Sequence, residues 1–169
     1  MRWGLIPHWA KDPKIGSRMI NARAETVAEK PAFRDALRRR RCLVLADGFY
    51  EWQRSGGARR PMRIVMRSGE PFAFAGLWSV WTDQQSNRIP SCAIITTEAN
   101  DLLRPIHYRM PVILPRDLED LWLEANVDDP GALGNVLAPY PGGAMGVYQV
   151  SPLVNSATND GPEVIARLA

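Results

Sequence analysis

Two segments carry polar side chains whose types and spacing suit anion binding and proton transfer. Asn21, Arg23 and Glu25 alternate along the first segment. In an extended backbone an amide, a guanidinium and a carboxylate would therefore share one face. In the second segment, Glu51 stands between Tyr50 and Trp52. A carboxyl in an apolar wall has a raised pKa and suits general acid or base catalysis. Taken alone, the first pattern fits a solvent-facing strand edge better, and the second fits an exposed Glu better.

The third segment centres on His107, one of only two histidines in the chain. Pro105 and Pro111 flank it, so its backbone is held out of a regular helix. With Arg109 two residues on, it would place a proton-transfer group beside an anion-binding group. A lone histidine is more often structural, and that alternative stays open.

Two tryptophans, Trp3 and Trp9, enclose Gly4 and Pro7 near the N-terminus. Paired indole rings could stack on a nucleic-acid base. They could equally anchor a core, which is the commoner use of tryptophan.

The elements that must position these side chains are mainly short strands with a few short helices, separated by Gly and Pro. Extended segments are expected at residues 18–27, 42–46, 49–53, 61–67, 72–81, 91–97, 112–114 and 147–150, with a turn at residues 55–57. Helices are expected at residues 31–40, at 117–125 with Leu118, Leu121 and Trp122 on one face, and at 129–137. This content predicts a β-rich α+β fold in a single domain over residues 1–169.

The charge of the chain is unevenly distributed. The net charge is +3, yet residues 1–68 hold 16 Lys and Arg against 6 Asp and Glu, and residues 69–169 hold 5 against 12. The cationic part is almost all arginine, which binds phosphate bidentately and stacks on bases. Either a polyanionic partner or an ordinary solvated arginine-rich surface fits this distribution.

Other features of the sequence exclude some classes of protein. The apolar runs are too short to span a membrane, and the N-terminus has no apolar signal region. Cys42 and Cys92 lie in unrelated apolar contexts, which argues against a disulfide framework or a zinc site. We therefore expect a cytoplasmic protein without a metal or an organic cofactor.

Six motifs in fixed order are the most specific feature of the sequence. They read W-G-L-I-P-x-W, N-A-R-A-E-T with K-P-x-F-R, R-R-C-L-V-x-A-D-G-F-Y-E-W, F-A-G-L-W, T-T-x-A-N and I-H-x-R-M-P-V-I-L. The series resembles the SOS-response-associated peptidase (SRAP) family from Trp3 to about Leu114, and more weakly from Val150 to Asn155.

The resemblance implies a β-rich fold with a basic groove for single-stranded DNA that carries abasic sites. In this family an N-terminal cysteine forms a Schiff base with the ring-opened sugar through its α-amine, and its thiol then closes a thiazolidine crosslink. An α-amine suits this chemistry because it titrates near pH 8. Self-cleavage exposes the cysteine in some members.

The resemblance also assigns roles to residues by motif. Asn21 would hold the N-terminal residue and the sugar oxygens, Glu51 would be the general acid and base, and His107 would assist proton transfer at the sugar hydroxyl. Arg23 and Arg109 would bind DNA phosphates. Trp3 would form part of the wall that faces the DNA.

Two departures from the family pattern affect these expectations. Arg2, not cysteine, follows Met1, and Tyr108 stands where members carry Asp. The first departure leads us to expect an N-terminally incomplete chain. A true start upstream at a Met-Cys is the favoured explanation, and a real truncation that leaves a DNA-binding remnant is the alternative. Three functions stay open: a monomeric crosslinking protein of the DNA-damage (SOS) response, a non-catalytic single-stranded DNA-binding module, and a peptidase or self-peptidase.

Overall fold

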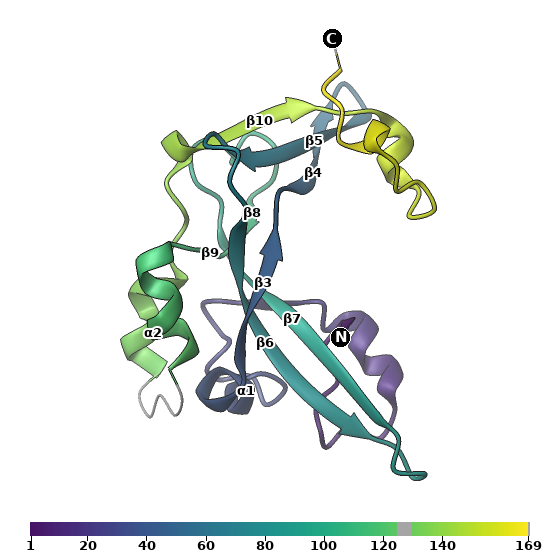
Figure 1. The fold of residues 1–169 in the computed structure, drawn as a ribbon, viewed down its shortest axis with the longest axis vertical. Helices are drawn as coiled ribbons and strands as arrows, with labels where there is room; N and C mark the ends of the chain where they lie inside the picture. The colour runs from purple at the N-terminus through teal and green to yellow at the C-terminus, as the bar shows by residue number, and fades with distance from the viewer. Residues whose placement is uncertain (125–129, 169) are drawn as a thin grey trace. The chain divides into compact units, whose positions relative to one another are not determined.

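The computed structural model describes residues 1–124 and 130–168, which form two units (Figure 1). The first unit contains Met1–Leu45, Ala73–Glu98 and Pro111–Tyr140. The second contains Ala46–Phe72, Ala99–Met110 and Pro141–Ala169. Each unit is therefore assembled from three separate stretches of chain. The single SRAP-like domain expected over residues 1–169 stays a prediction.

A seven-stranded sheet accounts for most of the first unit, and its centre is the long antiparallel pair β6 and β7 (Figure 1). These strands are rich in β-branched and aromatic residues, which favour the pleated conformation. Strand β3 pairs with β6, and the short strands β1 and β2 run parallel to β7 along its other edge. The strands are β1 (Arg2–Trp3), β2 (Asn21–Arg23), β3 (Arg41–Ala46), β6 (Phe72–Thr82), β7 (Arg88–Glu98), β8 (Arg109–Pro111) and β9 (Ile113–Leu114). A few residues at strand ends, Ala46, Phe72, Arg109 and Met110, belong to the second unit.

Short helices supply the side chains that cover the apolar face of this sheet. They are α1 (Arg34–Arg39), α2 (Glu119–Leu123) and the 3-10 helices Arg116–Leu118 and Pro130–Leu137. A further 3-10 helix, Pro13–Arg18, adds no side chain to this core cluster. Leu37 of α1 and Trp122 of α2 are buried against Leu77 of β6 and Ile95 of β7 in one core cluster. Alternation along each strand sends every second side chain to this face. The core of the first unit is therefore a helix-on-sheet layer, as an α+β fold requires.

Gly76 of β6 lies against β3 with no room for a side chain. A Cβ at this position would lie 2.8 Å from both Cys42 Sγ and Val44 Cγ2. We expect Gly76→Ala to destabilise the protein by about 1–3 kcal/mol, because β3 must shift to make room. Gly146→Ala is the matched control, since its nearest neighbour is 3.7 Å away and it sits in a strand as well. Urea unfolding of both variants tests this, and equal midpoints would contradict it.

The second unit contains a three-stranded antiparallel sheet in the order β10-β5-β4. Its strands are β4 (Phe49–Ser55), β5 (Ala58–Met66) and β10 (Met145–Gln149). Gly56 and Gly57 connect β4 to β5 with φ of 57° and 82°. Two successive positive φ values are those of a type I′ turn, which only glycine and a few polar residues adopt easily. The expected turn is confirmed, and both strands extend closer to it than the sequence indicated.

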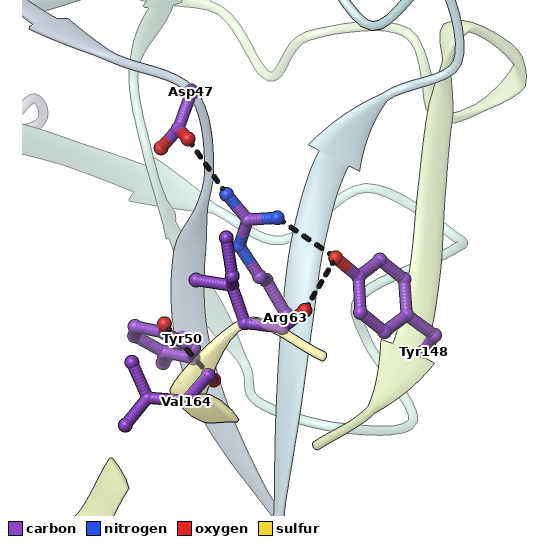
Figure 2. Close-up of polar contacts among 6 residues, drawn as sticks. Asp47, Tyr50, Arg63, Tyr148 and Val164 are labelled. Atoms are coloured by element: carbon purple, nitrogen blue, oxygen red, sulfur yellow. Dashed lines mark hydrogen bonds and ion pairs between the residues drawn. The ribbon is translucent and has the colours of Figure 1, made fainter. Parts of the chain in front are cut away.

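A polar network fixes the C-terminal segment to one face of this small sheet (Figure 2). Buried Arg63 donates hydrogen bonds to Asp47 at 2.9 Å and to the hydroxyl of Tyr148 at 2.8 Å. Tyr148 in turn donates to the carbonyl of Ile165, and Tyr50 donates to that of Val164. A guanidinium taken out of water needs such partners. The network therefore satisfies Arg63 and joins β4, β5, β10 and the C-terminal segment.

The predicted fold class is confirmed: the protein has mixed sheets with a few short helices, an α+β fold. The strands expected at 42–46, 72–81 and 91–97 are present as β3, β6 and β7. The extended segment expected at 18–27 was wrong for most of its length, because only Asn21–Arg23 finds partners on β7 and a turn follows.

The helix expectations need three corrections. The helix at 31–40 begins only at Arg34. The helix expected at 117–125 is α2 preceded by a 3-10 turn, and Leu121 is 40% exposed, because so short a helix buries only Trp122. The segment expected as a helix from 129 is a 3-10 helix, Pro130–Leu137. Ala125 and Asp129 lie outside the described residues.

No helix among the described residues is long and apolar enough to cross a membrane.

Candidate active site

Strand β4 presents Glu51 on the face of the small sheet opposite to its two aromatic neighbours. Glu51 pairs in register with Met62 of β5, and alternation sends Tyr50 and Trp52 to the other face. There Trp52 Nε1 donates to Asn155 Oδ1 at 2.7 Å. The Glu51 side chain is only 22% exposed. It is thus not the exposed residue that the segment alone favoured.

His107 is held beside Glu51 by a loop with its own hydrogen bonds. The loop closes where Ala99 N–H donates to the carbonyl of Tyr108 at 3.0 Å, and His107 N–H donates to the carbonyl of Leu103 at 2.9 Å. His107 Nδ1 lies 3.0 Å from the Arg109 carbonyl and 3.7 Å from Glu51 Oε1. The imidazole is therefore oriented by the backbone, with its Nδ1 side toward the carboxyl.

The environment of Glu51 favours its protonated form. Burial raises the pKa of its carboxyl above the ordinary value. The neighbouring His107 and the backbone N–H of Trp52 lower the pKa, but they do not offset the burial. A carboxyl with a raised pKa donates a proton more readily at neutral pH than an ordinary Glu, because more of it is protonated.

The raised pKa of Glu51 predicts a specific dependence of stability on pH. A group whose pKa is higher in the folded state contributes stability that is fully present below its unfolded pKa and lost as the pH rises through the folded pKa. We therefore expect the wild type to lose stability relative to Glu51→Gln as the pH rises above about 4. Thermal unfolding midpoints of both proteins across pH measure this difference. A difference that is constant with pH would contradict the raised pKa.

Arg109 and Tyr108 complete the surroundings of His107. Arg109 is half-buried, and its backbone N–H donates to His107 Nδ1 at 3.2 Å. Tyr108 is exposed, with its ring centroid 4.7 Å from that of His107. Glu51, His107 and Arg109, which we call the Glu51 group, thus place a half-buried carboxyl, an imidazole and a guanidinium-bearing residue within one unit.

Trp3, Asn21 and Arg23 gather along one edge of β7 in the first unit. The register pairs Trp3 with Cys92, Asn21 with Ile94 and Arg23 with Thr96. Asn21 and Arg23 are exposed while the residue between them is buried, as the alternation predicted. Glu25, the third residue of the alternating run, lies in the turn after β2. We call Trp3, Asn21 and Arg23 the β7-edge group.

The tryptophans near the N-terminus are surface residues. Trp3 is 57% exposed, and its indole N–H donates to the carbonyl of Ile20 at 2.8 Å. Trp9 is also exposed. The core-anchor alternative is therefore wrong for both, whereas an exposed indole held by one hydrogen bond is available for stacking.

Neither cysteine has the environment of a reactive thiol. Burial raises the pKa of Cys42 to about 11 and raises that of Cys92 as well. Nucleophilic cysteines instead have lowered pKa values, because the thiolate is the reacting form. Both thiols are thus protonated at neutral pH. Among the residues that the structure describes, no three His, Cys, Asp or Glu side chains are grouped to hold a metal ion.

Sequence reasoning did not single out Arg63 and Tyr148, although they tie β4, which carries Glu51, to the rest of its unit. The available signal was an arginine between Met62 and Ile64 in an alternating strand. Its partners, however, are 16 and 85 residues away in sequence.

Relatives of the chain are found by sequence and by structure. The chain is 52% identical to abasic site processing protein YoqW of Bacillus subtilis over 98% of its own length and 74% of that protein's. It is 34% identical to abasic site processing protein HMCES of Rattus norvegicus, covering 98% of this chain and 55% of that one. A crystal structure of a protein from Bacteroides thetaiotaomicron superposes with a TM-score of 0.92 at 31% identity, covering 99% of this chain and 75% of that one.

A family model also matches the sequence directly, and its description is SOS response associated peptidase (SRAP). It covers residues 1–157, which include both the Glu51 group and the β7-edge group. With that match and with relatives above 30% identity, the chain belongs to the SRAP family.

Proposed function

We propose that this protein senses abasic sites in single-stranded DNA and forms a covalent thiazolidine crosslink with them. The observation that carries the proposal is the pair of Glu51 and His107, a carboxyl of raised pKa 3.7 Å from an imidazole. The names of its curated relatives, abasic site processing proteins, support the choice of substrate. The nucleophile is an N-terminal cysteine, which the 169 residues do not contain at either of their first two positions.

The Glu51 group has a defined task in this reaction. The α-amine of the cysteine adds to the sugar aldehyde, and the carbinolamine then loses its hydroxyl as water to give an imine. Protonated Glu51 donates the proton that makes this hydroxyl a leaving group. The thiol next adds to the imine carbon while its proton passes to the nitrogen, so that the whole sequence releases water and closes the ring. His107 assists proton transfer at the sugar hydroxyl.

Arg109 and the β7-edge group, which includes Arg23, would hold the DNA. Arg23 and Arg109 bind phosphates, because a guanidinium matches the geometry of phosphate oxygens. Asn21 holds the sugar oxygens and the N-terminal residue, and exposed Trp3 forms part of the wall that faces the bases.

A non-catalytic DNA-binding module is the second candidate, because exposed Trp3 and Arg23 support binding without any covalent step. A peptidase that acts on other proteins has weaker support. Burial keeps the thiols of Cys42 and Cys92 protonated, so neither resembles an activated nucleophile.

The test compares the chain with a form that carries the expected cysteine. The Cys-bearing form is this chain expressed in frame from a start at which a cysteine directly follows the initiator methionine. Each protein is mixed with single-stranded DNA that contains one abasic site and is run on a denaturing gel. A heat-stable shifted band with the Cys-bearing form, absent after Cys→Ser, is the expected result. No band, with salt-sensitive retention on a native gel, would leave only the binding module.

A further inference from the structure

Three exposed arginines crowd the tip of the β4–β5 hairpin. Arg54 and Arg59 lie directly opposite each other in register, and Arg60 lies opposite Gln53. Alternation along the strands puts Arg54 and Arg59 on one face of the hairpin and Arg60 on the other. The tip is open, since a Cβ on Gly56 or Gly57 would meet nothing within 4 Å.

The turn brings Arg54 and Arg59 especially close. In a hairpin with a two-residue turn, the pair next to the turn is hydrogen-bonded and the following pair is not. Ser55 and Ala58 are the first pair here, so Arg54 and Arg59 form the second. Residues in such a pair have Cα atoms only about 4.5 Å apart. Two like charges that face each other at this spacing destabilise a hairpin.

No carboxylate offsets this repulsion within the described part of the chain. Asp47, Asp101 and Glu51 form ion pairs elsewhere, with Arg63, Arg104 and His107. By contrast, Arg63 in the same strand as Arg59 is hydrogen-bonded to the carboxylate of Asp47 and to the hydroxyl of Tyr148. The Arg54–Arg59 pair therefore carries two positive charges, as a binding site for an anion does, and no carboxylate of the described residues neutralises them.

We infer that Arg54 and Arg59 clamp a phosphate of the bound DNA strand at the tip of the hairpin. A phosphodiester offers two non-bridging oxygens, one for each guanidinium, so it replaces repulsion with two charge-assisted hydrogen bonds. The inference rests on the proposed function. Arg54 is three residues beyond Glu51 on β4, about 10 Å along the strand, and alternation puts the Arg54–Arg59 pair on the face of the hairpin opposite to Glu51. The clamp therefore holds a part of the DNA strand that passes the tip of the hairpin, beyond the proposed acid and base.

The decisive variant is Arg59→Glu, which should weaken DNA binding without destabilising the hairpin. It turns a repelling cross-strand pair into an attracting one, so the hairpin becomes no less stable. The same change places a carboxylate where the phosphate would bind. We expect affinity for a short single-stranded abasic oligonucleotide to fall about tenfold or more at low salt. The slope of log affinity against log salt should fall by about 0.7, the value for one phosphate contact on a single strand.

Two further variants complete the experiment, with binding followed by fluorescence anisotropy and folding by thermal unfolding. Arg54→Gln removes one of the repelling charges, and we expect the same loss of slope with an unchanged or higher midpoint. If Arg59→Glu fails to fold, Arg54→Gln alone tests the clamp. Arg104→Gln is the control, because Arg104 is exposed in the same unit and already paired with Asp101 at 3.3 Å. It should leave the slope as in the wild type.

The outcomes distinguish this inference from the proposed function. Loss of slope in Arg59→Glu and Arg54→Gln, with a wild-type slope in Arg104→Gln, supports the clamp. Wild-type affinity and slope in either folded hairpin variant would overturn the clamp while leaving the proposed function standing. Absence of DNA binding by the wild type would remove both.

Discussion

We expect replacement of Glu51 with Gln to slow formation of the proposed covalent adduct by about 100-fold, the lower end of what a positioned general acid contributes. The amide keeps the size and the position of the side chain on β4, but it has no proton to donate to the leaving hydroxyl. Binding of the DNA should change little, because the effect lies in the transition state and not in the ground state. Single-turnover time courses of the Cys-bearing form on denaturing gels measure the rate.

Glu70→Gln is the matched control for this experiment. Glu70 belongs to the same unit and is exposed, so the substitution removes the same charge away from the site. It should leave the rate as in the wild type. A rate for Glu51→Gln within about threefold of the control would remove Glu51 from the proposed chemistry, since a general acid contributes far more than that.

Replacing Trp122 with Ala costs about 4 kcal/mol of unfolding free energy, within the range for large aromatic residues in cores. Trp122 is 0% exposed in the core cluster, and its indole N–H donates to the carbonyl of Cys42 at 3.1 Å. Truncation leaves a cavity and removes a hydrogen bond to the Cys42 carbonyl on β3. It also removes the ring beneath the Arg41 guanidinium, which lies 5.6 Å from the ring centroid. A loss of about 4 kcal/mol is a large share of the unfolding free energy of an ordinary domain.

The control for Trp122 is Trp9→Ala, which removes an equally large side chain from an exposed position. We expect it to cost less than about 1 kcal/mol, as for other surface substitutions. Urea unfolding followed by far-ultraviolet circular dichroism gives both values. A similar loss in the two variants would mean that Trp122 is not the packing centre between α2 and the sheet.

The strands with strong local signals were predictable from the sequence. β6 and β7 are long, β-branched and aromatic, and the Gly-Gly turn between β4 and β5 fixes a hairpin. The short strands were not predictable in the same way. Arg2–Trp3 and Asn21–Arg23 are strands only because β7 offers partners some 70 to 90 residues away. Leu121 was placed on the wrong side because α2 is too short for its helical pattern to decide burial.

The same distinction between local and non-local features holds for the candidate site. The alternation of Asn21 and Arg23 is a local property, and their shared exposure follows from it. The contact between Glu51 and His107 is not local, because it depends on the register of β4 with β5 and on the loop closed at Ala99. Only the ordered motifs of the family indicated that these two residues work together. The interleaving of two units along the chain likewise has no local signal.

The intact mass of the adduct tests the central claim most directly. The Cys-bearing form is incubated with single-stranded DNA carrying one abasic site, and in parallel with DNA carrying a tetrahydrofuran analogue that has no aldehyde. We expect one covalent species with the abasic DNA, whose mass is that of protein plus full-length DNA minus one water, and none with the analogue. Only the separate masses of protein and DNA in both samples would contradict it.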